Sequence, residues 1–147
     1  MLHFSHFELV DEPLYYYYQH EESTVHSIDM GKLEDRLLMG KRMIEEARKG
    51  GYFKLYRREF EFAFSKLYYM NTLYTYMLGV KRPTTAFLKI LAKGMKEEFP
   101  EFQNNTYYLA EFDEEQRKMA ALHIKNPTLF LWYFKALYTY RKITRKA

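Results

Sequence analysis

Residues 60–77, FEFAFSKLYYMNTLYTYM, decide the expected fold. Apolar residues recur here with an alternating four-three spacing, which predicts one long helix over about residues 52–78 that ends at Gly79. Further aromatic residues lie off this seam, so the helix is apolar over much of its circumference and is expected to be the most buried one. The predicted seam consists of Tyr56, Phe60, Ala63, Leu67, Met70, Tyr74 and Met77.

Shorter helices are predicted on both sides of the central one. Each has a start or stop signal, namely an Asp N-cap, a proline in the first turn, a capping box or a Gly-Gly stop. Their expected spans are about residues 29–50, 83–99, 113–126 and 127 onward. Residues 103–106 are predicted to be a polar connector. The chain is therefore expected to be mainly α, with about five helices packed around the long central aromatic helix.

The first 28 residues have a different pattern. Residues 3–10 and 14–19 are predicted to be short strands, with Asp11-Glu12-Pro13 as the turn between them. Pro13 suits a turn and would not suit the middle of a central strand. A short N-terminal β-hairpin is therefore expected before the helices.

Composition narrows the class of protein. The chain has 147 residues, 48% apolar and 29% charged, which suits one globular domain. It has no cysteine, which excludes disulfides, Cys-ligated zinc and a thiol nucleophile. The first ten residues lack the basic region of a signal peptide, and no apolar run reaches the ~18 residues that span a bilayer. These features predict a cytoplasmic protein.

Charge is distributed unevenly along the chain. Residues 1–115 contain 15 Lys or Arg and all 19 Asp or Glu, whereas residues 116–147 contain 8 Lys or Arg and no acid. A basic end suits an anionic partner such as lipid headgroups, and a solvated basic helix face is the alternative. No RNA-binding or zinc-finger pattern occurs, so nucleic acid is not an expected partner.

No complete active site is evident from the residues alone. Glycine-rich phosphate loops, GxSxG and HExxH are all absent. Four of the five histidines lie within the first 26 residues. His3 and His6 would point to opposite faces of a strand, which argues against a closed metal site built from them.

Residues 11–27, DEPLYYYYQHEESTVHS, resemble the segment that closes the catalytic domain of bacterial family 2 glycosyltransferases, which have the GT-A fold. The run EPLYYYY-x-H-x-x-S carries the resemblance. The segments at residues 32–51, 60–77, 95–108 and 129–147 are similar in composition to the helical C-terminal extension of that family. The family usually has an arginine two residues before the histidine, where this chain has Tyr18.

The resemblance implies two parts. Residues 1–28 would be the last strands and loop of a GT-A domain whose DxD motif, catalytic base and nucleotide pocket lie outside this chain, and residues 29–147 the helical C-terminal domain. His20, Ser23 and Thr24 would then face the donor diphosphate and a divalent metal, Mg or Mn, in the parent enzyme. The parent would transfer a sugar from a nucleotide-sugar donor during surface polysaccharide synthesis, and this chain alone is expected to be inactive.

The aromatic and basic end predicts a second surface, where the chain meets a membrane or an acceptor at the inner face of the cell membrane. The alternative function is a non-enzymatic helical module for protein interaction or membrane docking. A homo-oligomer is expected in isolation, because unpaired strand edges and aromatic faces favour pairing. The residues of the predicted surface are Trp132, Lys135, Arg141, Lys142, Arg145 and Lys146.

Overall fold

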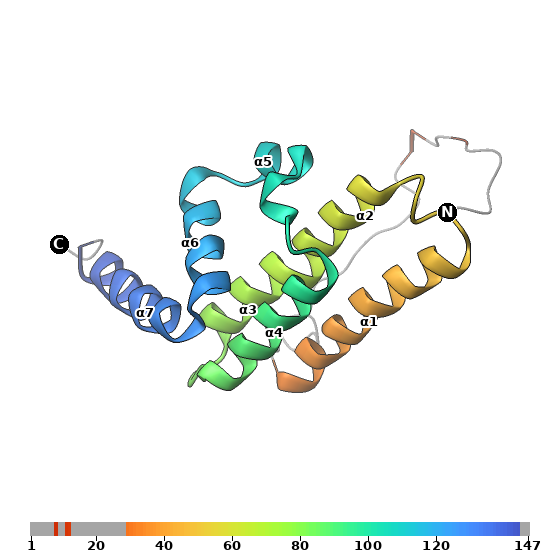
Figure 1. Ribbon diagram of the computed structural model, residues 1–147. Coiled ribbons are helices and arrows are strands. Elements are labelled where there is room, and N and C mark those ends of the chain that lie inside the picture. The colour runs from red at the N-terminus through yellow and green to blue at the C-terminus, as the bar shows by residue number, and fades with distance from the viewer. Residues whose placement is uncertain (1–7, 9–10, 13–28, 145–147) are drawn as a thin grey trace.

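The computed structural model describes residues 8, 11, 12 and 29–144. This part of the chain is mainly α, as predicted, and contains no strand. Most of the predicted hairpin, residues 3–19, lies outside it. The elements, in order, are α1 (Met30–Lys49), α2 (Arg57–Ala63), the π-helical segment η1 (Phe64–Met70), α3 (Asn71–Gly79), α4 (Thr85–Glu98), the 3-10 turn η2 (Phe102–Asn104), α5 (Thr106–Glu111), α6 (Glu114–Lys125) and α7 (Pro127–Thr144) (Figure 1).

The expected central helix is present, but it begins at Arg57 rather than near residue 52, because residues 53–56 form turns. α2, η1 and α3 follow one another without a break and form one long helix through the middle of the fold (Figure 1). α1 packs against η1 and α3, and α4 packs against η1. α6 and α7 pack on each other and on α4, while the short helix α5 packs on α2. α7 thus reaches the core through α4 and α6.

The buried face of the central helix differs from the predicted seam. Tyr56 and Leu67 of that seam are 42% and 51% exposed. Met70 and Met77 of the seam are buried, with 1% and 7% exposure. The other buried residues of the central helix were not in the seam, and they are Phe64, Ser65, Tyr68, Tyr69, Thr72, Leu73 and Tyr76. Leu67 lies in the π-helical segment, where i→i+5 hydrogen bonds place more residues in each turn than an α-helix does, so a seam with a period of 3.5 does not hold there. Tyr56 precedes the helix, as the N-cap of α2.

Local signals predicted most of the helix limits correctly. The Asp29 carboxylate accepts a hydrogen bond at the start of α1, and both bonds of the Asp113–Gln116 capping box are present in α6. Pro127 begins α7 as predicted. Pro83 lies just before α4 rather than in its first turn. Short-range hydrogen bonds thus fix helix ends where the residues themselves supply the partners.

The prediction of a polar connector at residues 103–106 was wrong in part, since this stretch ends η2 and begins α5. Asn105 is the cause. Its Oδ1 accepts hydrogen bonds from the backbone N–H groups of Tyr107 and Tyr108, at 2.9 and 3.3 Å. Its Nδ2 donates to the Arg58 carbonyl oxygen at 2.9 Å, which ties α5 to α2. An N-cap and a tertiary contact thus stabilise a helix of only six residues.

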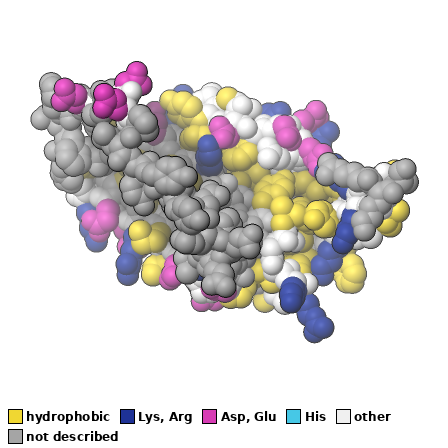
Figure 2. Space-filling view, turned by 180° about the vertical axis from the view of Figure 1, so that it is seen from behind, with side chains coloured by type: hydrophobic (Ala, Val, Ile, Leu, Met, Phe, Trp, Pro, Cys, Tyr) yellow, Lys and Arg dark blue, Asp and Glu magenta, His cyan; other side chains and the backbone are white. Residues whose placement is uncertain are grey.

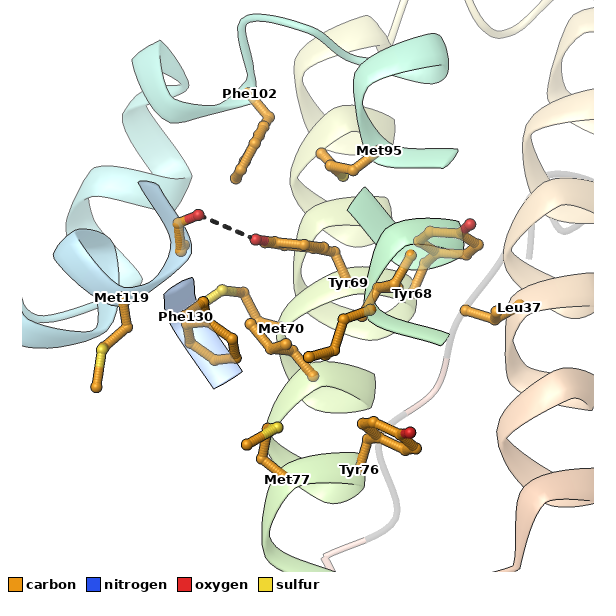
Figure 3. Packing of buried hydrophobic residues seen from close by; sticks show 14 of the residues in the cluster. Leu37, Tyr68, Tyr69, Met70, Tyr76, Met77, Met95, Phe102, Met119 and Phe130 are labelled. Carbon is orange, nitrogen blue, oxygen red and sulfur yellow. Dashed lines mark hydrogen bonds between the residues drawn. The ribbon is translucent and has the colours of Figure 1, made fainter. Parts of the chain in front are cut away.

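Tyr68 and Tyr69 leave η1 in opposite directions, Tyr68 towards α1 and Tyr69 towards α6 (Figure 3). Tyr68 stacks on Phe64 and lies between two glycines. A Cβ atom at Gly40 of α1 would meet the Tyr68 ring at 2.7 Å, and one at Gly94 of α4 would meet Tyr68 Oη at 2.0 Å. Close approach of α1 and α4 to η1 therefore requires glycine at both positions.

This packing predicts the effect of Gly94→Ala. Alanine stabilises a helix interior by about 1 kcal/mol relative to glycine. Overpacking against Tyr68 Oη costs more, so we expect the free energy of unfolding to fall by roughly 1–3 kcal/mol. Tyr68 Oη has no hydrogen-bond partner among the described residues, so Tyr68→Phe removes the clashing atom at little cost. Urea unfolding of both single variants and the double variant measures the coupling. Equal destabilisation by Gly94→Ala with Tyr or Phe at position 68 would show that this contact is not the cause.

Candidate functional site

α7 has apolar residues on two sides. Phe130, Leu131 and Phe134 are buried and pack its first half on the body of the protein. No residue of the described part of α7 beyond Phe134 is buried. A helix that is apolar nearly all round is usually covered on both sides, and α7 is covered on one. The uncovered part of α7 is therefore the strongest candidate for a functional surface.

The side of α7 that faces away from the body carries an exposed apolar row, which we name the outer stripe. Leu129, Ala136 and Ile143 recur every seven residues, and aromatic residues lie beside them. Trp132, the only tryptophan of the chain, is 68% exposed. In Figure 2 hydrophobic and basic side chains lie next to one another at the right-hand end of the view, where α7 projects. The outer stripe consists of Leu129, Trp132, Ala136, Tyr140 and Ile143. Tyr133, beside it, is turned towards α6 and lines a depression with Lys118 and Leu122.

Lys135 borders the outer stripe. Its Nζ lies 6.0 Å from the centroid of the Trp132 ring, at the limit of a cation–π contact. No Asp or Glu occurs in α7. The stripe therefore combines exposed aromatic rings with a neighbouring cation and without a neighbouring acid from its own helix.

A depression, which we name the inner groove, lies on the other side of α7, between its second half, α3 and α6. Its volume is about 450 Å³. Arg141 Nη2 crosses to Glu115 Oε2 of α6 at 2.7 Å, and the hydrogen bond from Arg141 lowers the pKa of this carboxyl group. Lys142 also borders the groove. The apolar lining comes from Tyr74, Leu78, Met119, Phe134, Leu137 and Tyr138.

The predicted surface residues are therefore not all brought together. Trp132 and Lys135 lie at the outer stripe, whereas Arg141 and Lys142 line the inner groove. Helical geometry explains why Trp132 and Arg141 lie apart, because nine residues turn an α-helix by about half a revolution beyond two full turns. Lys135 and Lys142 are seven residues apart and lie one behind the other along the same side of α7. Outside the described residues lie the other predicted site residues, His20, Ser23, Thr24, Arg145 and Lys146.

A buried polar chain lies beneath α7, at the meeting point of η1, α4 and α6. His123 is fully buried, and its Nε2 donates to the Leu88 carbonyl oxygen at 3.1 Å. Because a carbonyl oxygen can only accept, Nδ1 of the neutral ring is the acceptor, and the Tyr69 hydroxyl donates to it at 2.9 Å. Tyr69 Oη also lies 3.2 Å from the Ala120 carbonyl oxygen (Figure 3). Both ring nitrogens of the buried His123 therefore have hydrogen-bond partners.

Burial lowers the pKa of His123 to about 4, and nearby Lys96 acts in the same direction. With no exposed surface, this imidazole cannot meet a solvent-borne substrate, and its role is structural. The sequence analysis missed it. Its burial could have been predicted from its position on the apolar face of α6, four residues after Met119 and three after Ala120.

The described residues contain no cluster of three or more His, Asp or Glu side chains able to hold a metal ion. None of their helices combines the length and the hydropathy needed to cross a bilayer. The chain was also compared with protein-family models, curated proteins and solved structures, and none of them matches it. Function is therefore inferred from its own residues and geometry.

His123 predicts how stability depends on pH. Its pKa is about 4 when folded and near the ordinary 6.5 when unfolded. The unfolded chain therefore binds this proton first, so the stabilisation is complete above pH 6.5 and is lost as the pH falls from 6.5 to 4. We expect the free energy of unfolding to drop by roughly 2 kcal/mol between pH 7 and pH 5. His123→Gln, which keeps a donor and an acceptor without titrating, should flatten this slope. The same loss in both proteins would rule out His123 as the responsible group.

Proposed function

We propose that this chain is the C-terminal part of a family 2 glycosyltransferase. The observation that carries the proposal is the run from Glu12 to Ser27, with its EPLYYYY-x-H-x-x-S pattern, followed within two residues by the Asp29 cap of a helical domain. In that family the corresponding loop closes the donor site, and helices come directly after it. The parent enzyme transfers a sugar from a nucleotide-sugar donor to an acceptor in surface polysaccharide synthesis.

In this proposal His20, Ser23 and Thr24 belong to the donor site. An imidazole nitrogen can ligate a divalent metal, Mg or Mn, or hydrogen-bond a phosphate oxygen. The Ser and Thr hydroxyl groups can donate to the same diphosphate. Three side chains from one loop do not make a nucleotide pocket or supply a catalytic base, so the chain alone has no transferase activity.

A second function, docking on an anionic membrane surface, is favoured by the outer stripe. Trp and Tyr suit the boundary between headgroups and acyl chains, because a ring is apolar on its face and polar at one end. Leu129 and Ile143 add apolar area at the two ends of the stripe. Lys135 adds about 1 kcal/mol near an anionic surface, and no acid of α7 opposes it. Docking of this kind would hold a transferase close to a membrane-bound acceptor.

The alternative occupant of the outer stripe is a helix of another protein or of a second copy. The seven-residue repeat of Leu129, Ala136 and Ile143 has the period of a coiled-coil seam. If the stripe binds a helix of another protein, any binding of this protein to vesicles should not depend on lipid charge. If it binds a second copy, the protein should be a dimer in solution. These outcomes separate an interaction module from a membrane-docking one.

Vesicle binding tests the docking function. We expect the protein to sediment with vesicles of phosphatidylcholine and phosphatidylserine, and much less with phosphatidylcholine alone. Trp132→Ser removes a large side chain that the membrane would bury, and Lys135→Glu reverses a charge at the membrane surface. Each variant should therefore bind vesicles about tenfold more weakly. Two control variants carry matched changes on the exposed face of α4, Ile90→Ser and Lys89→Glu. Both should bind vesicles as the wild-type protein does.

Three results would contradict the docking function. They are equal binding to neutral and anionic vesicles, no binding to either, and equal losses in the α4 controls. Sedimentation equilibrium of the wild-type protein and of Trp132→Ser measures whether the protein forms a dimer. A dimer that Trp132→Ser dissociates would assign the outer stripe to a second copy instead.

Activity tests the assignment to a glycosyltransferase. In a polypeptide that carries this chain after a complete catalytic domain, His20→Ala should lower sugar transfer roughly 10–100-fold, the usual cost of losing a group that supports a metal site. Tyr18→Phe should have a much smaller effect, since a phenol does not supply the charge of an arginine. The measurement is turnover of nucleotide sugar by variants whose circular dichroism matches that of wild type. Wild-type turnover by His20→Ala would refute the donor-site role.

A further inference from the structure

The inner groove exists because α7 packs on the body through only part of its length. Phe134 is the last buried residue of the described helix. Beyond it α7 contacts α6 through the Arg141–Glu115 ion pair, and the space beside that pair is the inner groove. At about 450 Å³ the groove falls within the range of small-molecule sites and is too small to enclose a partner helix.

The lining of the groove divides into two chemical regions. Tyr74, Leu78, Met119 and Phe134 belong to an apolar floor contributed by α3, α6 and α7. Such a floor offers hydrocarbon contact and few hydrogen-bond donors, so it favours an alkyl chain over a sugar or a nucleotide.

The rim of the groove carries a net positive charge. Arg141 and Glu115 neutralise each other at 2.7 Å. Lys142 is exposed and makes no hydrogen bond or ion pair with a described residue. One unpaired ammonium group, with a guanidinium beside it, therefore lines the apolar groove. An anionic group attached to an alkyl chain would satisfy both regions at once.

We propose that the inner groove binds a single-chain amphiphile with an anionic head group. The alkyl chain lies on the apolar floor, and the carboxylate or phosphate contacts Lys142 and Arg141. The site is separate from the outer stripe, and the inference does not depend on the assignment to a glycosyltransferase.

Calorimetric titration with monomeric laurate, below its aggregation concentration and without vesicles, tests the proposal. We expect saturable binding of one laurate per chain. Dodecyltrimethylammonium, with the same chain length and a cationic head, should bind at least about tenfold more weakly, because Lys142 repels it. Inorganic phosphate should show no saturable binding, because it lacks the alkyl chain.

Variants locate the site. Lys142→Glu and Leu78→Trp should each weaken laurate binding at least about tenfold, the first through charge and the second by filling the groove. Leu78 is 55% exposed, so the larger side chain does not disturb the core. Two matched controls, Lys135→Glu at the outer stripe and Ile90→Trp on α4, should bind laurate like wild type.

The proposal is overturned by any of four results. These are absence of laurate binding, equal binding of the cationic and anionic surfactants, saturable binding of phosphate with the affinity of laurate, and wild-type affinity in Leu78→Trp. Lys135→Glu also separates the two surfaces, because it should reduce vesicle binding and leave laurate binding intact. A failure of membrane docking is therefore distinguishable from a failure of the groove proposal.

Discussion

The rest of the structure depends on Tyr68 and Tyr69, two neighbouring residues of η1 that both enter the core, on different sides (Figure 3). Tyr68 brings α1 and α4 close through Gly40 and Gly94. Tyr69 meets α6 through His123. The π-helical turn that carries both residues is a rare element, which in natural proteins is mostly a short bulge within an α-helix and is frequent at functional sites.

The position of α7 follows from this core. His123 joins the central helix to α4 and α6, and α7 packs on those two helices through its first half. Its second half projects from the body, with the Arg141–Glu115 pair beside it. The outer stripe and the inner groove are the two surfaces that this arrangement leaves uncovered. Exposed aromatic residues in such number carry a free-energy cost in water unless a partner covers them. We propose an anionic partner because α7 carries basic residues and no acid.

Interactions between near neighbours in the chain were the most predictable part of the fold. The Asp29 cap and the Asp113–Gln116 box were predicted because their donors and acceptors lie within one helical turn. The buried seam was predicted in part: Met70 and Met77 are buried, whereas Leu67 is exposed because it lies in a π-helical turn that the residue pattern does not indicate. Helix α5 was missed because Asn105 depends on Arg58, far away in sequence. At the site, Trp132 and Lys135 were found from composition, but the pairing of Arg141 with Glu115 needs the packing of α7 on α6, which a one-dimensional pattern does not contain.

We propose, from the geometry of α7, that its outer stripe enters the interface of an anionic membrane. Trp132 reports on this contact directly, because it is the only tryptophan of the chain. The measurement is its fluorescence emission with phosphatidylserine-containing vesicles, followed by quenching with lipids brominated along the acyl chain. The account predicts a shift to shorter wavelength and quenching by lipids brominated near the headgroup, both weakened by added salt. Vesicle-bound protein whose Trp132 emission is unshifted and unquenched would contradict it.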